Sequence, residues 1–293
     1  MMNPWRRRHP LSILVYYAAA VFLMIRIRHP LLDVLIQGVA LIHYTCLAGS
    51  ARGLRMLCCS LGAALLCLVI NPLLNHRGVT LLFLLGEQRI TGEAVLYGAH
   101  MAVFLMASLL LFSCFSHYMT TERIMTLMGK RLPSFALLFS MILRFVPRAG
   151  RDFREMTALH GNRPAVWSAL LGISLEDAVE RSLSMRDRYY GSGDRSSYHA
   201  RRLELWDGLL LLISVMTAAG VAGYLFLVKY RIYFFPRIHV EPLPPWMWPV
   251  LWLFYSLPLI GQGREELSWY LSRRRITGST TRRRKNRQSI SGH

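Results

Sequence analysis

The sequence predicts an all-α integral membrane protein with about six transmembrane helices and a pair of long cytoplasmic helices. Three observations support this prediction. The 293 residues are 53% hydrophobic and only 17% charged, whereas soluble proteins carry roughly 25% charged residues. The apolar residues gather into runs long enough to cross the roughly 30 Å hydrocarbon core of a bilayer. The Lys and Arg residues, which give a net charge of +19, fall mostly on one side of the resulting topology.

Six apolar stretches approach the length of about 20 residues that a spanning helix needs. The first and the last are short, so we expect flanking residues to complete them. A further run, residues 135–146, is too short to span and is followed by three arginines, which predicts a half-embedded segment. The six expected spans are Leu11–Ile25, Leu31–Gly49, Leu54–Leu74, Ala94–Phe115, Trp206–Val228 and Trp246–Ile260.

The distribution of basic residues predicts the orientation of these spans, because Lys and Arg concentrate in cytoplasmic loops. With the N-terminus inside, 28 of the 35 Lys and Arg residues lie in the inner segments. We therefore expect both termini in the cytoplasm. The expected regions are residues 1–116 with four spans, a cytoplasmic region 117–205, residues 206–262 with two spans, and a basic tail 263–293.

The tail contains two basic clusters, at residues 273–275 and 282–287. Basic clusters beside a span usually contact anionic lipid and fix topology. We therefore expect membrane lipid, and no nucleic acid, as the partner of this tail.

The cytoplasmic region is predicted to contain several helices separated by Pro and Gly. We expect helices over 120–132 and 134–160, and a short apolar piece over 166–172. Ser174 is expected to cap a third helix that runs to about residue 190, because Glu176 and Asp177 would occupy its first turn.

Both long helices are expected to end in an arginine, Arg163 in one and Arg188 in the other. A single arginine there would simply complement the helix dipole. Two similar ends in one loop also suit a second role, because a guanidinium projected from a rigid helix end can bind a partner's carboxylate in a bidentate manner. This pattern predicts a docking surface for an acidic groove on a cytosolic protein.

Motifs of catalysis and nucleotide binding are missing from the sequence. It contains no P-loop, no His-Glu-x-x-His and no Gly-x-Ser-x-Gly. The five cysteines lie in apolar runs without a Cys-x-x-Cys pair, which argues against a disulfide scaffold and a zinc site. We therefore expect a non-catalytic chain that binds no metal or cofactor.

Three ionisable residues fall within the expected spans, where such residues are costly and are candidates for function. Asp33 lies near an outer span end, where we expect it to be solvated. His43 and His100 are interpreted as neutral side chains hydrogen-bonded between helices, with a role as proton or ligand groups as the alternative.

Three blocks of residues occur in an order and spacing that point to one known family. The first block is Asn71, Pro72, His76, Gly78 and Thr80, followed by Glu93 and Gly98; the second is Leu143-Arg144-Phe145-Val146-Pro147; the third is Ser184 to Gly191, with Gly193. Together they resemble the transmembrane T component of energy-coupling factor (ECF) transporters, importers of vitamins and metal ions related to ATP-binding-cassette (ABC) transporters.

The resemblance implies roles for the two helix ends. In that family each of two coupling helices ends in an Ala-Arg-Gly-like motif, whose arginine docks on a cytosolic ATPase. The matching positions here are Asn162-Arg163-Pro164 and Asp187-Arg188-Tyr189. The arginine matches in both motifs, whereas Asn and Asp stand in place of Ala, and Pro and Tyr in place of Gly.

The function implied by the resemblance is that of an energy-coupling subunit in a prokaryotic plasma membrane. Such a subunit transmits the conformational change of two cytosolic ABC-type ATPase subunits to a small substrate-binding membrane protein. ATP is used by these partners, which can be two copies of one chain or two different chains. Vitamin, cobalt and nickel all remain open as cargo. Two alternatives from other classes are a membrane-embedded enzyme that binds an anionic substrate through the arginine-rich loop, and a non-transport membrane scaffold.

Overall fold

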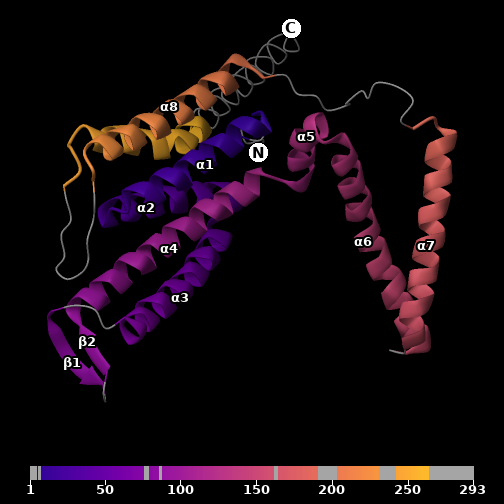
Figure 1. Ribbon diagram of the computed structural model, residues 1–293, viewed down its shortest axis with the longest axis horizontal. Helices are drawn as coiled ribbons and strands as arrows, with labels where there is room; N and C mark the ends of the chain where they lie inside the picture. Colours follow the sequence, from indigo (N-terminus) through magenta and orange to yellow (C-terminus); the bar gives the residue numbers. More distant parts are fainter. Residues whose placement is uncertain are drawn as a thin grey trace, which may run out of the picture. The chain divides into compact units, whose positions relative to one another are not determined.

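Helices make up most of both units into which the chain divides. The computed structural model describes residue 5 and residues 8–75, 79–85, 88–161, 164–190, 203–230 and 242–263. One unit comprises residues 1–120 and 203–293, and the other comprises residues 121–202 (Figure 1).

The first unit contains the long apolar helices and one short hairpin. Its elements are α1 (Pro10–Ile27), α2 (Pro30–Ala48), α3 (Ser50–Leu74), β1 (Leu81–Leu85), β2 (Gln88–Thr91), α4 (Gly92–Tyr118) and α8 (Leu205–Leu227), followed by helical residues 247–263. The second unit consists of α5 (Thr121–Arg131), α6 (Pro133–His160) and α7 (Pro164–Asp187).

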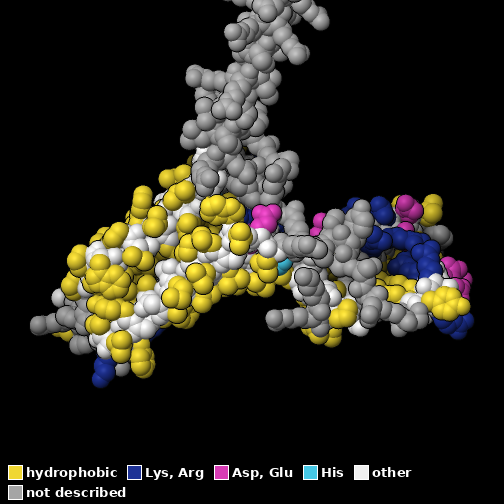
Figure 2. Space-filling model, turned by 90° about the horizontal axis from the view of Figure 1, so that it is seen from above, with side chains coloured by type: hydrophobic (Ala, Val, Ile, Leu, Met, Phe, Trp, Pro, Cys, Tyr) yellow, Lys and Arg dark blue, Asp and Glu magenta, His cyan; other side chains and the backbone are white. Residues whose placement is uncertain are grey.

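Five helices in the described part of the chain, α1, α2, α3, α4 and α8, are long and apolar enough to cross a membrane. Their bounds lie within a few residues of the predicted spans, which supports the prediction of a helical membrane protein. The sixth predicted span corresponds to the shorter helix 247–263. Hydrophobic side chains cover the visible face of the first unit, on the left of Figure 2, as expected for a surface in contact with lipid.

Local sequence explains where the first helices begin and end. Pro10 and Pro30 occupy the first turns of α1 and α2, where the missing N–H of proline has no helical partner in any case. The Nδ1 atom of His9 accepts a hydrogen bond from the backbone N–H of Leu11 at 3.2 Å, which caps α1. Gly49 takes a φ of 92° between α2 and α3, a conformation that glycine adopts without a steric penalty.

A two-stranded antiparallel hairpin between α3 and α4 departs from the prediction of an all-α chain. Strand β1 pairs with β2 so that Leu84 lies opposite Arg89 and Leu85 opposite Gln88. The apolar run Leu81–Leu85 is too short to show a period, so it did not predict a strand. The hairpin lies at the ends of α3 and α4 (Figure 1).

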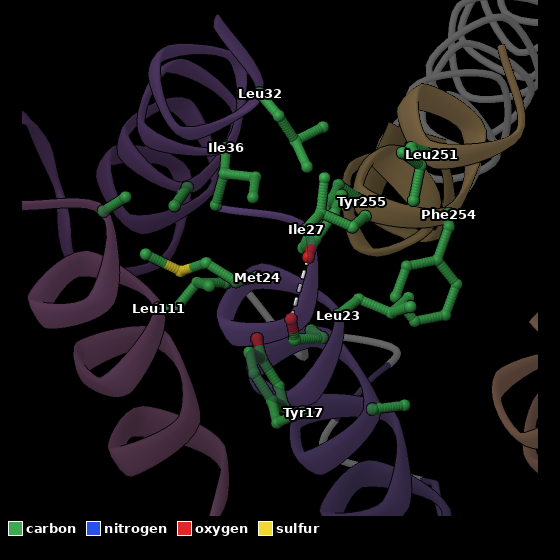
Figure 3. Packing of buried hydrophobic residues seen from close by; sticks show 14 of the residues in the cluster. Tyr17, Leu23, Met24, Ile27, Leu32, Ile36, Leu111, Leu251, Phe254 and Tyr255 are labelled. Atoms are coloured by element: carbon green, nitrogen blue, oxygen red, sulfur yellow. Dashed lines mark hydrogen bonds between the residues drawn. The ribbon is translucent and has the colours of Figure 1, made fainter. Parts of the chain in front are cut away.

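The core of the first unit surrounds α1. In this helix 56% of the residues are buried, the largest share among the five candidate spans. Side chains of α1 such as Leu23, Met24 and Ile27 are enclosed by α2, α4 and the helix 247–263 (Figure 3). The Tyr255 hydroxyl donates a hydrogen bond to the carbonyl oxygen of Ala20 at 2.8 Å, drawn as a dashed line in Figure 3.

Polar side chains join the helices at one end of this core. Arg8 Nη1 lies 3.6 Å from Asp207 Oδ1, and the Ser12 hydroxyl donates to the carbonyl of Asp207 at 3.1 Å. The starts of α1 and α8 therefore lie together. Gln262 Nε2 donates to the Tyr118 hydroxyl at 3.0 Å, which joins the ends of α4 and of helix 247–263.

Aromatic packing marks the link between α1 and α2. His29, between these helices, contacts the Trp248 ring edge-to-face at 5.4 Å between ring centroids. Burial lowers the pKa of His29 from its usual value, because a charged imidazolium loses hydration there. Chain segments more than 200 residues apart are thus fixed to one another at this link.

We predict that Tyr255→Phe lowers the free energy of unfolding by about 0.5–1.5 kcal/mol, because it removes the buried hydrogen bond that joins helix 247–263 to α1. Thermal unfolding of the full chain in detergent micelles measures this change. Tyr44→Phe is the matched control, since the Tyr44 hydroxyl makes no hydrogen bond within the described residues. Equal stability of the two variants would contradict the role of the Tyr255 hydroxyl.

Candidate functional site

The candidate site lies in the second unit, on the hairpin formed by α6 and α7. The two helices meet at the turn near His160 and Pro164 and separate from there (Figure 1). Close to the turn, the rings of Phe153 and Trp167 lie 4.6 Å apart between centroids. This aromatic contact and the buried Val166 anchor the two helices at that end.

An ion-pair network joins α6 to α7 farther from the turn. Asp177 Oδ2 accepts a hydrogen bond from Arg181 Nη2 at 3.1 Å and lies 3.2 Å from Arg148 Nη1 in a second ion pair. Arg148 also lies 3.9 Å from Asp152, the pair that helical spacing predicts. The Arg148 side chain is 53% exposed, so each pair is worth roughly 0–1 kcal/mol, and the network fixes geometry more than it adds stability.

The C-terminus of α7 forms a Schellman motif. The backbone N–H of Tyr190 donates to the carbonyl of Met185 at 3.0 Å, and that of Tyr189 to the carbonyl of Arg186 at 3.0 Å. Tyr189 has a φ of 53°, the left-handed position that this motif usually gives to glycine. Arg188 is therefore the C-cap residue, and its side chain is exposed.

This geometry gives a physical meaning to the second arginine motif. Asp187 is the last helical residue, Arg188 caps the helix, and Tyr189 occupies the left-handed site. An Ala-Arg-Gly motif would suit the same geometry, with a good helix former before the arginine and glycine after it. Tyrosine in the left-handed conformation carries a steric cost of roughly 1–2 kcal/mol.

The first arginine motif is only partly described. Helix α6 ends at His160, with Gly161 as its C-cap at a φ of 70°. Asn162 and Arg163 lie outside the described residues, so the expected arginine in the terminal turn is not placed. Pro164 begins α7, where proline suits the first turn of a helix.

The prediction of a break within α7 was wrong. Residues 166–172 and the segment after Ser174 form one continuous helix. The Ser174 hydroxyl does not cap a new helix but donates to the carbonyl of Leu170 at 2.6 Å. A serine inside a helix can satisfy its hydroxyl in this way, so Ser174 does not interrupt the helix.

The first family-like block is brought together between α3 and α4. A Cβ atom on Gly98 would lie 3.4 Å from the Cβ and Nδ2 atoms of Asn71 and from the carbonyl oxygen of Leu68. Gly98 thus permits close approach of the two helices beside Pro72, which lies inside α3. His76 and Gly78 of the same block lie outside the described residues.

Glu93 and Thr80 close the loop that contains the hairpin. The Thr80 hydroxyl donates to Glu93 Oε2 at 2.7 Å, and the Thr80 backbone N–H donates to the same carboxylate at 3.2 Å. Glu93 lies in the first turn of α4, where a negative charge is favoured by the helix dipole. These two motif residues therefore have a structural role.

The second and third blocks lie in the second unit. Arg144 and Pro147 are both exposed on α6, and within the described residues Arg144 forms no ion pair with the network around Asp177. Gly191 and Gly193 of the third block lie outside the described residues.

Asp33 corrects one sequence-based expectation. Its side chain is fully buried, with Oδ2 lying 3.6 Å from Nδ1 of the buried His100, whereas we expected a solvated carboxylate. The partner on α4 is 67 positions away, so no local pattern predicts the pairing. His43, on the same helix as Asp33, is also buried, and its ring lies 5.6 Å from that of Tyr118 between centroids.

Within the described residues, no group of three or more His, Cys, Asp or Glu side chains is arranged to hold a metal ion.

A scan of the chain against models of known protein families finds no match, and a search of curated proteins finds none either. The resemblance to ECF T components therefore remains a prediction that rests on the three sequence blocks.

We predict that Gly98→Leu lowers the free energy of unfolding by about 1–3 kcal/mol, because the larger side chain would force α3 and α4 apart. Gly220→Leu is the control, since a Cβ on Gly220 of α8 meets nothing within 4 Å. Thermal unfolding in detergent compares the two. A Gly98→Leu variant as stable as the control would show that the helices do not need this close approach.

We predict that Tyr189→Gly stabilises the end of α7 by about 0.5–1 kcal/mol, since glycine adopts the left-handed conformation without the tyrosine's steric cost. Thermal unfolding and hydrogen exchange of the amides of residues 189 and 190 measure the effect. Tyr190→Gly serves as the control, because Tyr190 does not occupy the left-handed position, and no gain is expected there. Faster amide exchange in Tyr189→Gly would be inconsistent with the Schellman assignment.

Proposed function

We propose that this chain is the transmembrane energy-coupling subunit of an ECF-type ABC importer for a vitamin or transition-metal ion. The observation that carries the proposal is the end of α7, where a Schellman motif presents the exposed Arg188 as the cap of a long helix. A helix end fixed in this way directs its guanidinium at a carboxylate on a partner, and arginine suits bidentate contacts of that kind.

The hairpin that carries this arginine is suited to transmit force. The Phe153–Trp167 contact and the Arg148–Asp177–Arg181 network hold α6 and α7 to each other at two places along their length. A displacement applied at the helix end would therefore move both helices as one body. In the proposed mechanism, closure of two cytosolic ATPase subunits moves Arg163 and Arg188, and the helices pass this movement to a small substrate-binding membrane protein.

The packing of the first unit supports the proposed topology of six spans. The starts of α1 and α8 lie together through Arg8, Ser12 and Asp207, and the ends of α4 and helix 247–263 meet through Tyr118 and Gln262. Alternating spans with both termini on one side would place all of these residues on that side. The excess of Lys and Arg in the same segments assigns it to the cytoplasm in this proposal.

In this proposal the chain has no catalytic or cofactor-binding residues of its own. ATP is bound and hydrolysed by the partners, and cargo specificity belongs to the small membrane protein. The exposed apolar side chains of the first half of α6, including Phe135, Leu138 and Phe139, are the proposed contact surface for that protein.

We predict that the double variant Arg163→Glu and Arg188→Glu loses its ATPase partners, because each substitution turns an attraction for carboxylate into a repulsion. The experiment is a pull-down of the tagged full chain from native membranes in mild detergent, with mass spectrometry of the proteins retained. Wild type is expected to retain one or two ABC-type ATPase polypeptides and a small hydrophobic protein.

The control for this experiment is the double variant Arg151→Glu and Arg154→Glu, which makes the same charge change at exposed positions within α6. It is expected to retain the partners. Retention of ATPases by the Arg163 and Arg188 variant would overturn the docking assignment. A wild-type chain that comes alone, while ATPases are detectable in the same lysate, would overturn the function, and turnover by that isolated chain would favour an enzyme instead.

A further inference from the structure

A cleft of about 590 Å³ lies between the first half of α6 and the second half of α7. Its size falls within the range of roughly 300–1,000 Å³ that is typical of small-molecule sites. The cleft lies beside the Arg148–Asp177 pair and extends away from the turn between the helices. It is lined by Met141, Ile142, Phe145, Ser174, Ala178, Arg181, Ser182, Met185, Arg186 and Tyr190.

The sequence explains why the space is open and apolar. Helix α7 contributes the short side chains of Ser174, Ala178 and Ser182, whereas α6 contributes Met141, Ile142 and Phe145. Short side chains opposite large ones leave room where the two helices separate. The apolar surface continues out of the cleft along α6, where Leu138 and Phe139 are at least half exposed.

The charge of the cleft is positive. The described residues that line it include two arginines and no acid. Arg181 pairs with Asp177, which Arg148 also contacts, and Arg148 in turn lies 3.9 Å from Asp152, so these four side chains balance in charge. Arg186 makes no ion pair with any residue in the described part of the chain, and it is exposed at the mouth. The cleft therefore combines an apolar wall with two guanidinium groups suited to a phosphate.

We propose that the cleft between α6 and α7 binds one anionic phospholipid, with an acyl chain against Met141, Ile142 and Phe145 and the phosphate at Arg186 and Arg181. A helical segment of another protein is about 10 Å across and would need a longer groove. A phospholipid matches both the apolar wall and the positive rim, and the five candidate spans keep the chain in a bilayer where this ligand is always present. The proposal does not rest on the transport function.

The test measures lipid binding to the purified full chain by native mass spectrometry, with phosphatidylglycerol and phosphatidylcholine as the two probes. We expect phosphatidylglycerol to bind more tightly, and Arg186→Gln to weaken its binding about tenfold, the effect of losing one charge-assisted contact of roughly 1.4 kcal/mol. This variant leaves the Arg181–Asp177 pair intact. Arg154→Gln, which removes the same charge from an exposed position within α6, is the control and is expected to bind as wild type does.

A second variant separates the acyl chain from the headgroup. Ser182→Phe fills the cleft and keeps both arginines, so it is expected to weaken phosphatidylglycerol binding as well. Free glycerol 3-phosphate, added as a competitor, is expected to displace little of the lipid. Equal binding to Arg186→Gln and Arg154→Gln, unchanged binding to Ser182→Phe, or full displacement by glycerol 3-phosphate would each overturn the proposal. In the first two cases a polypeptide segment becomes the occupant to test.

Discussion

The enclosure of α1 is the constraint on which the rest of the first unit depends. A helix surrounded by other helices in an apolar medium has no water to satisfy polar groups, so each of them needs a protein partner. The Tyr16 hydroxyl bonds to the carbonyl of Phe254, and the Tyr255 hydroxyl bonds to the carbonyl of Ala20. These reciprocal bonds fix the relative heights of α1 and helix 247–263, which apolar packing alone leaves free to slide.

The second unit follows a different rule. Its helices bury little, and α7 exposes Leu171, Leu175 and Val179 by 60% or more of their surface. Its shape is set by a few contacts along one hairpin, the aromatic pair near the turn and the two arginines on Asp177. Exposed apolar surface on this scale is typical of an interaction site, which agrees with the proposal that this unit works in an assembly and next to a bilayer.

Span positions could be predicted from the sequence because apolar runs of 20 residues are unambiguous in composition. The helices at 121–131 and 133–160 were also predictable, since Pro133 and Gly161 mark their ends. The Arg148–Asp177 pair and the burial of Asp33 against His100 were not, because both join distant positions and leave no local pattern. At the candidate site, Arg188 could be selected from its place near a helix end. The left-handed conformation of Tyr189 could not be predicted, because it contradicts the local preference of tyrosine.

The wide sequence separation of the contacts around α1 has a consequence for biosynthesis. The hydrogen-bond partner of Ser12 is Asp207, which is made 195 positions later. The partner of Tyr16 is Phe254, which is made 238 positions later. At roughly 5–20 residues per second, the first helix leaves the ribosome ten seconds or more before its hydrogen-bond partners exist. Nascent α1 therefore spends that interval with its polar groups unmatched, and a truncated chain that ends before the last helix cannot complete the bundle.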